Sequence, residues 1–284
     1  MRRHRGLSID GGGQRGIVPA EGLHLLGLNH EDFDWMVGNS AGGIIVLALA
    51  AGYEPSEIVG LFRENGPEIF DGRMWEHGLL WSKHSAHGVN GVLQRKFSDM
   101  RMRDLKVPAT VCTWNHTLSR AVFISSETHP DWLVWEAARC TSAAPSYFPP
   151  HAVHEEYFGT SNYWDGGVFC NSPVIEAYTQ GREGFATDFE LLALGTGYAS
   201  RPLKHPRSSG LLGVAGDVVN ALMDGGMQTA HDWAARLARL DGVTFRCYND
   251  ALPAYVQPQM DICTPEQNMA LLQFARDLYG HQDQ

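Results

Sequence analysis

A serine flanked by glycines is the first group in the sequence that is suited to nucleophilic chemistry. Residues Gly38–Gly42 read Gly-Asn-Ser-Ala-Gly and run directly into an apolar segment, Gly43–Gly52. This is the G-x-S-x-G pattern of a nucleophile elbow, in which the glycines permit a sharp strand-to-helix turn and leave the hydroxyl uncrowded. The pattern predicts Ser40 as a nucleophile, with Gly38 and Gly42 forming the turn. The alternative is that Ser40 only caps the helix that follows.

A serine hydroxyl is a weak nucleophile unless a base accepts its proton. Thirteen histidines are present, none in a setting that marks it as that base, and most are expected to be ordinary surface residues. The stretch Tyr163–Val168 instead places Asp165 among aromatic and apolar residues. Burial there would raise the pKa of the carboxyl group and make it a better base. Gly166 and Gly167 would let the backbone approach the serine, although an ordinary Asp-Gly turn is the alternative.

A glycine-rich turn follows the first predicted strand. Residues 10–16 read Asp-Gly-Gly-Gly-Gln-Arg-Gly, which contains the G-x-G-x-x-G pattern of dinucleotide sites. In such a site an acid that binds the ribose stands at the carboxyl end of the second strand. Here that end reads Val37–Ser40, whereas the nearest acids, Asp32 and Asp34, lie at the beginning of the strand. The sequence therefore disfavours a dinucleotide.

The elements that must position these groups alternate between strands and helices, which indicates a layered α/β domain. The strands are expected at Gly6–Asp10, Phe33–Gly38, Val107–Trp114, Arg120–Ser125, Glu190–Leu194 and Val243–Tyr248, and the first two helices at Gln14–Leu28 and Gly43–Gly52.

The last helix has clear signals at its start. Thr264 is a plausible N-cap, Pro265 suits the first helical position, and Gln267 would complete a capping box. The apolar face of this helix is predicted to consist of Met269, Leu272, Ala275 and Tyr279.

Composition and charge narrow the class of protein. The chain has 284 residues, of which 44% are hydrophobic and 19% charged, as in a globular protein. Its net charge of −10, from 22 basic and 32 acidic residues, argues against nucleic-acid binding and against electrostatic docking on anionic membranes. Any contact with a bilayer would therefore have to rest on apolar side chains.

Cysteine usage and the N-terminal residues indicate a reducing, cytoplasmic environment. The five cysteines are odd in number and none forms a C-x-x-C pair, which predicts reduced thiols rather than disulfides or a cysteine zinc site. The N-terminal Met-Arg-Arg-His-Arg-Gly leads into a strand without an apolar run of signal-peptide length. No stretch approaches about 18 uninterrupted apolar residues, so no membrane-spanning helix is expected.

Together these motifs resemble the patatin-like phospholipases. The resemblance implies a single domain over residues 1–284, a three-layer α/β/α sandwich around a central, mostly parallel sheet. The glycine- and histidine-rich stretch 66–93 fits no pattern of the family and is predicted to be an irregular insertion or flap. In chain order, the resemblance is carried by Asp10–Gly16, Gly38–Gly42, Ala138–Pro150, Asp165–Gly167, Leu191–Gly197 and Met260–Tyr279.

The resemblance also implies an activity. Patatin-like enzymes are serine acyl hydrolases that cleave fatty-acyl esters of phospholipids and other lipids through a Ser–Asp dyad without a histidine. Carried over, Ser40 is the nucleophile that forms an acyl-serine intermediate, and Asp165 is the base. Neither a cofactor nor a metal is implied. The oxyanion site implied by the family consists of Gly11, Gly12 and Gly13, with Arg15 adding charge or bracing the loop.

Departures from the family pattern occur beside the motifs. Asn39 stands where many relatives carry threonine or another small residue, and Gln14 replaces a commonly apolar position. The segment Ala138–Pro150 is expected to pack under the dyad loop. The apolar stretch Ser208–Met227 is expected to be a core helix or, alternatively, to line an acyl channel or touch a bilayer.

Three other functions remain open. They are a soluble carboxylesterase acting on small esters, an effector lipase switched on by a signal, and a catalytically silent binding module. The expected partner is a phospholipid or another acyl ester, with peripheral membrane contact left open. The sequence makes no prediction of the acyl position, the head group or the oligomeric state.

Overall fold

The computed structural model describes residues 3–70, 82–155, 159–199 and 211–280, and for residues 155 and 211–222 it describes the backbone only. Within these residues an eight-stranded sheet runs through the molecule in the order β5-β6-β3-β2-β1-β7-β8, with β4 paired to β3. The strands are β1 (His4–Ile9), β2 (Trp35–Asn39), β3 (Ala109–Asn115), β4 (Arg120–Ser125), β5 (His151–Glu155), β6 (Gly159–Asp165), β7 (Phe189–Leu194) and β8 (Thr244–Tyr248).

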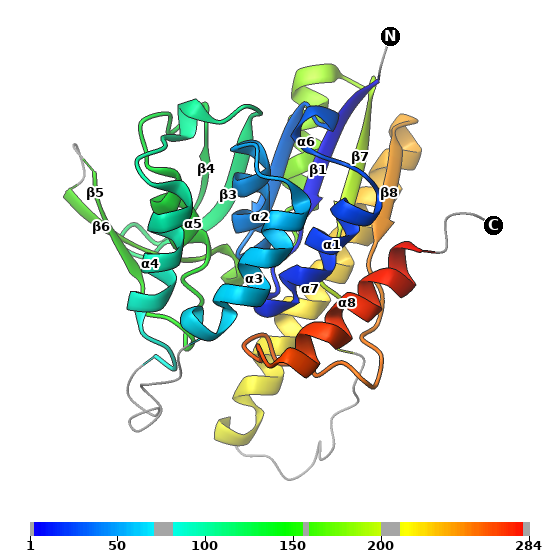
Figure 1. The fold of residues 1–284 in the computed structure, drawn as a ribbon. Coiled ribbons are helices and arrows are strands. Elements are labelled where there is room, and N and C mark those ends of the chain that lie inside the picture. Colours follow the sequence, from blue (N-terminus) through cyan, green and yellow to red (C-terminus); the bar gives the residue numbers. More distant parts are fainter. Residues whose placement is uncertain (1–2, 71–81, 156–158, 200–210, 281–284) are drawn as a thin grey trace.

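Five neighbouring strands of this sheet are parallel, namely β3, β2, β1, β7 and β8. β1 pairs in parallel with β2 and β7, β2 with β3, and β7 with β8, whereas β4, β5 and β6 join through antiparallel pairs. In Figure 1, β1 descends from the N-terminus at the top, so the carboxyl ends of the parallel strands lie at the lower edge. Loops at that edge of a parallel sheet are the usual place for a site.

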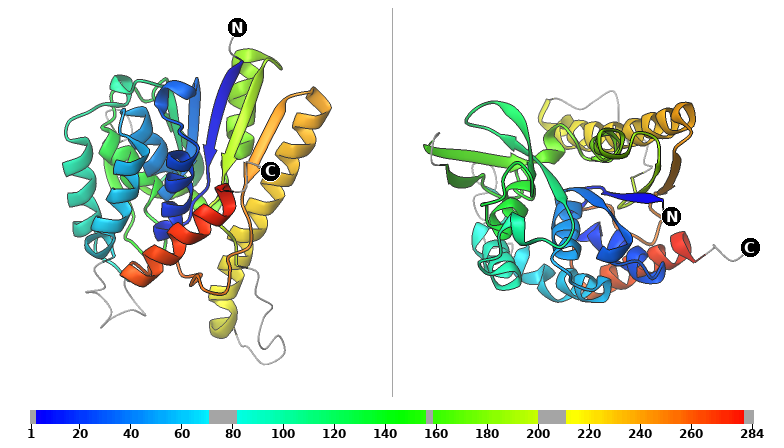
Figure 2. Two further views of the ribbon diagram at one scale, coloured as in Figure 1. Left: turned by 45° about the vertical axis from the view of Figure 1, so that its right-hand side comes forward. Right: turned by 90° about the horizontal axis from the view of Figure 1, so that it is seen from above.

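Helices cover both faces of the sheet (Figure 2). On one face lie α1 to α5 and α8, and on the other α6 and α7, each face with its own cluster of buried apolar side chains. The predicted α/β/α sandwich is therefore confirmed. The helices are α1 (Ile17–Leu25), α2 (Ala41–Ala50), α3 (Pro55–Ile69), α4 (Ala86–Phe97), α5 (Val134–Thr141), α6 (Val174–Phe185), α7 (Leu211–Asp241) and α8 (Pro265–Tyr279), with short 3-10 turns that include η1 (Gly13–Gly16) and η5 (Gly166–Val168).

Most predicted elements are present, with differences at their ends. The helix expected over Gln14–Leu28 begins as the 3-10 turn η1 and becomes α-helical only at Ile17. The helix α2 is buried along its whole length, as its uniformly apolar sequence predicts.

The C-terminal helix α8 differs from the prediction in two contacts. The Thr264 hydroxyl accepts a hydrogen bond from the Gln267 backbone amide, but the Gln267 side chain bonds the backbone of Gln257 instead of completing a capping box. Met269, expected on the apolar face, is 55% exposed, whereas Leu271 is fully buried. Leu272, Ala275 and Tyr279 are buried as predicted, so the predicted apolar face is wrong only at Met269.

The stretch predicted as an irregular insertion or flap, 66–93, and the apolar stretch 208–227 are largely helical where they are described. Residues 66–69 complete α3 and residues 86–93 belong to α4, so both ends of the expected insertion are regular. Residues 71–81 lie outside the described part, as do residues 208–210 of the second segment. From Leu211 to Met227 that segment belongs to α7, in which Met227 is buried but Gly225 and Gly226 are exposed, so the prediction of a core helix stays a prediction.

Candidate active site

Ser40 occupies a strained turn between β2 and α2. Its backbone has φ 53° and ψ −123°, a conformation unusual for any residue other than glycine. A side chain on Gly38 would collide with the Gly42 carbonyl, and one on Gly42 with the Ile9 carbonyl, at 2.4 and 2.3 Å. The Ser40 side chain makes no capping hydrogen bond. The turn thus has the geometry of a nucleophile elbow, and the hydroxyl is left for another partner.

Helix α5 supports the elbow from the side. The Ser40 backbone amide donates to the Thr141 hydroxyl at 2.9 Å, and that hydroxyl donates to the Cys112 carbonyl at 2.6 Å. Just beyond α5, the Ala143 carbonyl accepts a hydrogen bond from the Asp165 amide at 3.0 Å. The segment 138–150 therefore holds both the elbow and the aspartate loop, as expected. Thr141 itself was not singled out from the sequence.

Asp165 ends β6 beside the elbow and is 4% exposed. Its carboxylate accepts hydrogen bonds from the Gly167 amide at 2.7 Å and from the Asn39 side chain at 3.3 Å, and the neighbouring Ser40 hydroxyl helps to lower its pKa. Residues that are far apart in the chain are thus brought together, because β6 pairs with β3 next to the end of β2.

The surroundings of Asp165 keep its affinity for protons high. Burial raises the pKa of Asp165 to about 6, against the opposing effect of the Ser40 hydroxyl, of the hydrogen bonds from Gly167 and Asn39 and of the more distant charge of Arg139. A carboxylate with a raised pKa is a stronger base toward a hydroxyl than an ordinary one. Asn39, a departure from the family pattern, is one of the donors to this carboxylate.

The glycine turn after β1 lies against the elbow, since a side chain on Gly11 would meet the Cβ of Ser40 at 3.3 Å. The Gly11 amide already donates to the Asn171 carbonyl at 2.9 Å, so it is not free to bind an oxyanion. In the described part of the structure the amides of Gly12 and Gly13 donate to no other group. These two amides therefore remain as candidate donors of the three glycines predicted.

The turn needs glycine at both positions. A Cβ on Gly12 would lie 2.3 Å from the Thr196 hydroxyl, and one on Gly13 would lie 2.3 Å from the Met260 carbonyl. Gly13 also has φ 57°, in the left-handed region that glycine adopts readily. The close packing that excludes side chains here leaves the backbone amides bare.

Gln14 ties the turn to two helices. Its amide donates to the Met260 carbonyl at 2.7 Å, and its side chain donates to the Phe62 carbonyl at 3.0 Å and to the Asn268 side chain at 2.8 Å. These bonds connect the glycine turn to α3 and α8. A polar residue at this commonly apolar position therefore has a clear structural reason.

Asp10 anchors the turn from the other side through a buried ion pair. Its carboxylate lies 3.0 Å from Nε2 of His231 on α7, while Nδ1 of that ring lies 3.5 Å from the Cys247 sulfur. Burial alone would lower the pKa of His231, but the Asp10 carboxylate outweighs it and raises the pKa to about 11. The imidazolium is thus the stable form at neutral pH. His231 is buried rather than a surface residue, and no sequence pattern linked it to Asp10.

Arg15 lies behind the glycine turn, 2% exposed, and its Nε has no hydrogen-bond partner in the described structure. Burial lowers the pKa of Arg15, and the charges of Asp224 and Tyr147 oppose that effect. The guanidinium therefore contributes positive charge near the turn, and in the described structure its Nε–H remains an unused hydrogen-bond donor.

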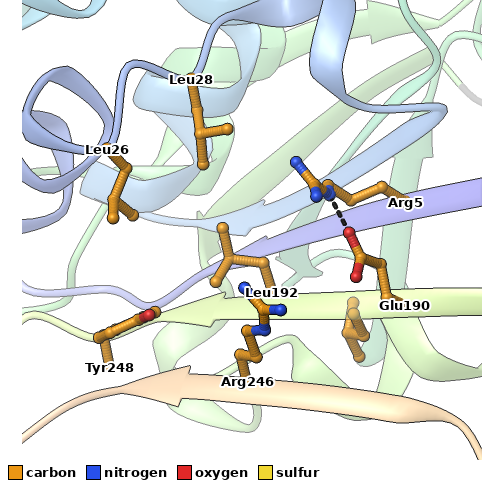
Figure 3. Close-up of a pocket in the computed structure, with 8 residues that line it drawn as sticks. Arg5, Leu26, Leu28, Glu190, Leu192, Arg246 and Tyr248 are labelled. Atoms are coloured by element: carbon orange, nitrogen blue, oxygen red, sulfur yellow. Dashed lines mark hydrogen bonds and ion pairs between the residues drawn. The ribbon is translucent and has the colours of Figure 1, made fainter. Parts of the chain in front are cut away.

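A separate cavity of about 200 Å³ lies on the sheet away from these groups (Figure 3). Its polar lining includes the ion pair between Arg5 and Glu190 and the guanidinium of Arg246, and its apolar lining includes Leu192. Neither Ser40 nor Asp165 borders it, so the cavity does not belong to the candidate site.

Comparison with known proteins identifies the family. The model of the patatin-like phospholipases matches residues 7–178, more than half of the chain, and the chain belongs to this family. This confirms the resemblance seen in the sequence motifs.

Two curated relatives have names that describe phospholipases. A cGAMP-activated phospholipase of Pseudomonas aeruginosa is 35% identical over 60% of this chain and 54% of its own length. The rat 85/88 kDa calcium-independent phospholipase A2 is 30% identical over 61% of this chain and 23% of its own. The chain thus spans about half the length of the first relative and a quarter of the second.

A solved structure supports the fold. The crystal structure of VipD from Legionella pneumophila superposes with a TM-score of 0.58 at 14% identity, covering 98% of this chain and 66% of that one. Among the residues that the structure describes, no helix is both long enough and apolar enough to cross a bilayer.

Proposed function

We propose that this chain is a lipid acyl hydrolase that works through a dyad of Ser40 and Asp165. The observation that carries the proposal is the placement of the buried Asp165 carboxylate, whose pKa is raised to about 6, beside the strained elbow of Ser40, where the side chain of the adjacent Asn39 donates to it. Membership of the patatin-like phospholipases supports a fatty-acyl ester as the substrate class. The location, expected to be the cytoplasm, and the single domain over residues 1–284 remain predictions.

In the first half-reaction, Oγ of Ser40 attacks the carbonyl carbon of an acyl ester while Asp165 accepts the hydroxyl proton. The carbon–oxygen double bond opens, and negative charge collects on the former carbonyl oxygen. When the tetrahedral intermediate collapses, the ester bond breaks and the alcohol leaves with the proton held by Asp165. The products are an acyl-serine and an alcohol such as a lysophospholipid.

In the second half-reaction a water molecule replaces the alcohol. Asp165 accepts a proton from the water as its oxygen attacks the acyl-serine, and it returns the proton to Oγ of Ser40 as the acid leaves. Because one carboxyl group performs both transfers, its pKa must lie below the working pH yet well above that of an ordinary aspartate. A pKa of about 6 meets both conditions near neutral pH.

The oxyanion is proposed to bind at the free amides of Gly12 and Gly13. These amides need no rearrangement, since the turn is already held by its neighbours, and preorganised donors of this kind contribute strongly to catalysis. Arg15 is assigned a supporting role through its charge. Gly11, bonded to Asn171, keeps the turn in place rather than donating to the oxyanion.

Hydrolysis of a short-chain nitrophenyl ester tests the dyad. We expect Ser40→Ala and Asp165→Asn each to lower kcat by about 10³-fold or more, as loss of a nucleophile or its base does in other serine hydrolases. Ser98→Ala is the matched control, because Ser98 has a similar positive φ of 49° but ends α4, away from the site. Full activity in Ser40→Ala would exclude the mechanism, whereas no activity in the unaltered protein would favour a silent binding module.

A comparison of substrates separates a lipase from a soluble esterase. Faster hydrolysis of phosphatidylcholine vesicles than of the soluble ester supports the lipid assignment, and the reverse supports a carboxylesterase. Two relatives, from Pseudomonas aeruginosa and Escherichia coli, bear the name cGAMP-activated phospholipase. The same assay with and without cGAMP therefore tests whether this chain is also an effector that responds to a signal.

A further inference from the structure

Three exposed apolar side chains lie beside the candidate site. Val168 and Phe169 directly follow the dyad loop and are 47% and 41% exposed, and Leu118, in the turn between β3 and β4, is 40% exposed. Exposed apolar side chains next to a site commonly mark a contact surface, and the loops that carry these three residues leave β6 and β3 near the candidate site. These three residues are called the apolar rim below.

Strand register places the rim at the same edge of the sheet as Ser40. Asn39, the residue before the nucleophile, pairs with Cys112, and β3 continues from there to Asn115 before the turn that carries Leu118. β6 returns along β3 so that Asp165 pairs with Thr113, and Val168 follows three residues later. The rim therefore lies at the lower edge of the sheet in Figure 1, where the parallel strands end.

The rim rests on an aromatic support rather than on a loose loop. The Phe169 ring packs 6.2 Å from the Trp114 ring and 6.0 Å from the Phe123 ring, measured between ring centroids. Trp114 and Phe123 project from β3 and β4 and are themselves only partly buried. The Phe169 amide also donates to the Gly166 carbonyl at 3.0 Å, which fixes the backbone of the rim to the dyad loop.

We propose that the apolar rim docks the protein onto an electrically neutral lipid surface, such as a phosphatidylcholine bilayer, and so presents the acyl ester to the site. This inference rests on the proposed function and adds to it the surface through which the substrate is approached. Aromatic and aliphatic side chains enter the boundary between head groups and acyl chains by burying their apolar area. Tryptophan is favoured at this boundary, which suits Trp114.

Charge selects a neutral lipid surface over an anionic one. The chain carries a net charge of −10, so an anionic membrane would repel it at long range. Attraction must then come from apolar contact at short range, which is what the rim supplies. Binding of this kind changes little with salt, whereas binding through charge weakens as salt is added.

The chain contains a matched control at its other edge. Leu240, near the end of α7, is 82% exposed, more than any residue of the rim. α7 ends at Asp241, and β8 then begins with Thr244 level with Glu190 near the amino end of β7. Leu240 therefore lies at the edge opposite the nucleophile, and a surface that binds through the rim leaves it in water.

The experiment measures binding without turnover. In a Ser40→Ala background, partition onto phosphatidylcholine vesicles is measured by sedimentation for the otherwise native protein and for Val168→Ser, Phe169→Ser and Leu240→Ser. We expect Phe169→Ser to weaken partition about tenfold, from the apolar area it no longer buries, and Val168→Ser to weaken it several-fold. Leu240→Ser should bind like its parent.

A second measurement does not require a substitution in the rim. Phosphatidylcholine with brominated acyl chains should quench tryptophan emission of the Ser40→Ala protein, and Trp114→Phe should remove most of this quenching. Thermal unfolding of each variant shows whether it is folded. A folded Phe169→Ser that partitions as before, or quenching that is independent of Trp114, would overturn the inference.

Other outcomes identify a different partner and would also overturn it. Binding only to anionic vesicles with loss at high salt would point to charge. Self-association that Phe169→Ser abolishes, without vesicle binding, would point to a second copy of the chain. Because the binding assay uses an inactive protein, its failure is distinct from failure of the dyad, which the ester assay reports.

Discussion

Asp10 and Asp165 are two buried aspartates on either side of the elbow, and they differ in what surrounds them. Asp10 is paired with the His231 imidazolium, whose pKa is raised to about 11. Asp165 is surrounded by neutral donors, and burial raises its pKa to about 6. The carboxyl group with a cation in contact serves as an anchor, whereas the one without such a contact has a raised pKa suited to a base.

Removing the proposed base should cause the largest loss of activity. In contrast, it should raise the stability of the folded protein. Asp165→Asn is expected to lower kcat by about 10³-fold or more. It should also raise the free energy of unfolding at neutral pH by about 1–3 kcal/mol, because the folded state no longer holds a carboxylate that burial disfavours. Ester hydrolysis and urea unfolding measure the two effects. If Asp165→Asn loses both activity and stability, this contradicts the role of Asp165 as a base whose charged form is disfavoured by burial.

Removing the cation of the anchor should mainly affect stability. His231→Gln leaves the Asp10 carboxylate buried without a charged partner, and loss of one member of a buried pair costs about 3–5 kcal/mol. Asp10→Asn combined with His231→Gln should recover part of this loss, since no buried charge then remains. Asp232→Asn, one residue along α7 on an exposed position, is the control. Urea unfolding of the native protein, Asp10→Asn, His231→Gln and the double variant gives the coupling energy.

The pH dependence of that loss follows from the pKa of His231. The folded pKa of about 11 lies above the ordinary value of 6.5, so the stabilisation is fully present below pH 6.5 and is lost progressively as pH rises toward 11. The difference in unfolding free energy between the native protein and His231→Gln should therefore shrink in alkaline buffer. If the difference instead grows with pH, His231 is not the imidazolium partner of Asp10 in the folded protein.

The activity itself should follow the protonation of Asp165. We expect kcat/KM for the soluble ester to fall about tenfold for each pH unit below about 6, because the protonated carboxyl group cannot accept the serine proton. Stability changes over the same pH range. Because the folded pKa of Asp165 is raised, the free energy of unfolding should fall as pH rises from 3.8 through about 6. If the fall of kcat/KM at low pH is the same at different salt concentrations and in different buffers, this supports the titration of a buried carboxyl group. A flat profile down to pH 4 would contradict the assignment.

The smallest expected effect comes from the neutral donor that distinguishes this chain from many relatives. Asn39→Ala removes a hydrogen bond that lowers the pKa of Asp165, so the acidic limb should move to higher pH and activity near pH 6.5 should fall by a few-fold. Asn29→Ala, at a distant 3-10 turn, should leave the limb in place. A shift to lower pH would show that Asn39 does not donate to the carboxylate.

Much of the fold could be predicted from the sequence because local signals were strong. β4 lies where predicted, at Arg120–Ser125, and α2 is buried as its apolar sequence indicates. The elbow was predictable for a similar reason, since G-x-S-x-G stands between a predicted strand and a uniformly apolar helical segment. The family motifs then indicated the order of the elements. The roles assigned to Ser40 and Asp165 remain predictions.

The parts that could not be predicted depend on partners distant in the chain. No pattern near Gly11 shows that its amide is already bonded to Asn171, and none near Met269 shows that its side chain is exposed. His231 has the sequence context of an ordinary surface helix, yet the fold buries it against Asp10. Hydrogen bonds and ion pairs across long loops are set by packing, and packing has no local signature.

The sequence alone therefore determined which residues are chemically able to act: a serine on a glycine-flanked turn, an aspartate before two glycines, and a turn of three consecutive glycines. Only the tertiary structure decided which groups surround each buried carboxyl group, and with them its role. The proton affinity of a carboxyl group depends on the solvent and donors within a few ångströms of it. Those neighbours come from other strands and helices, so the difference between Asp10 and Asp165 exists only in the folded protein.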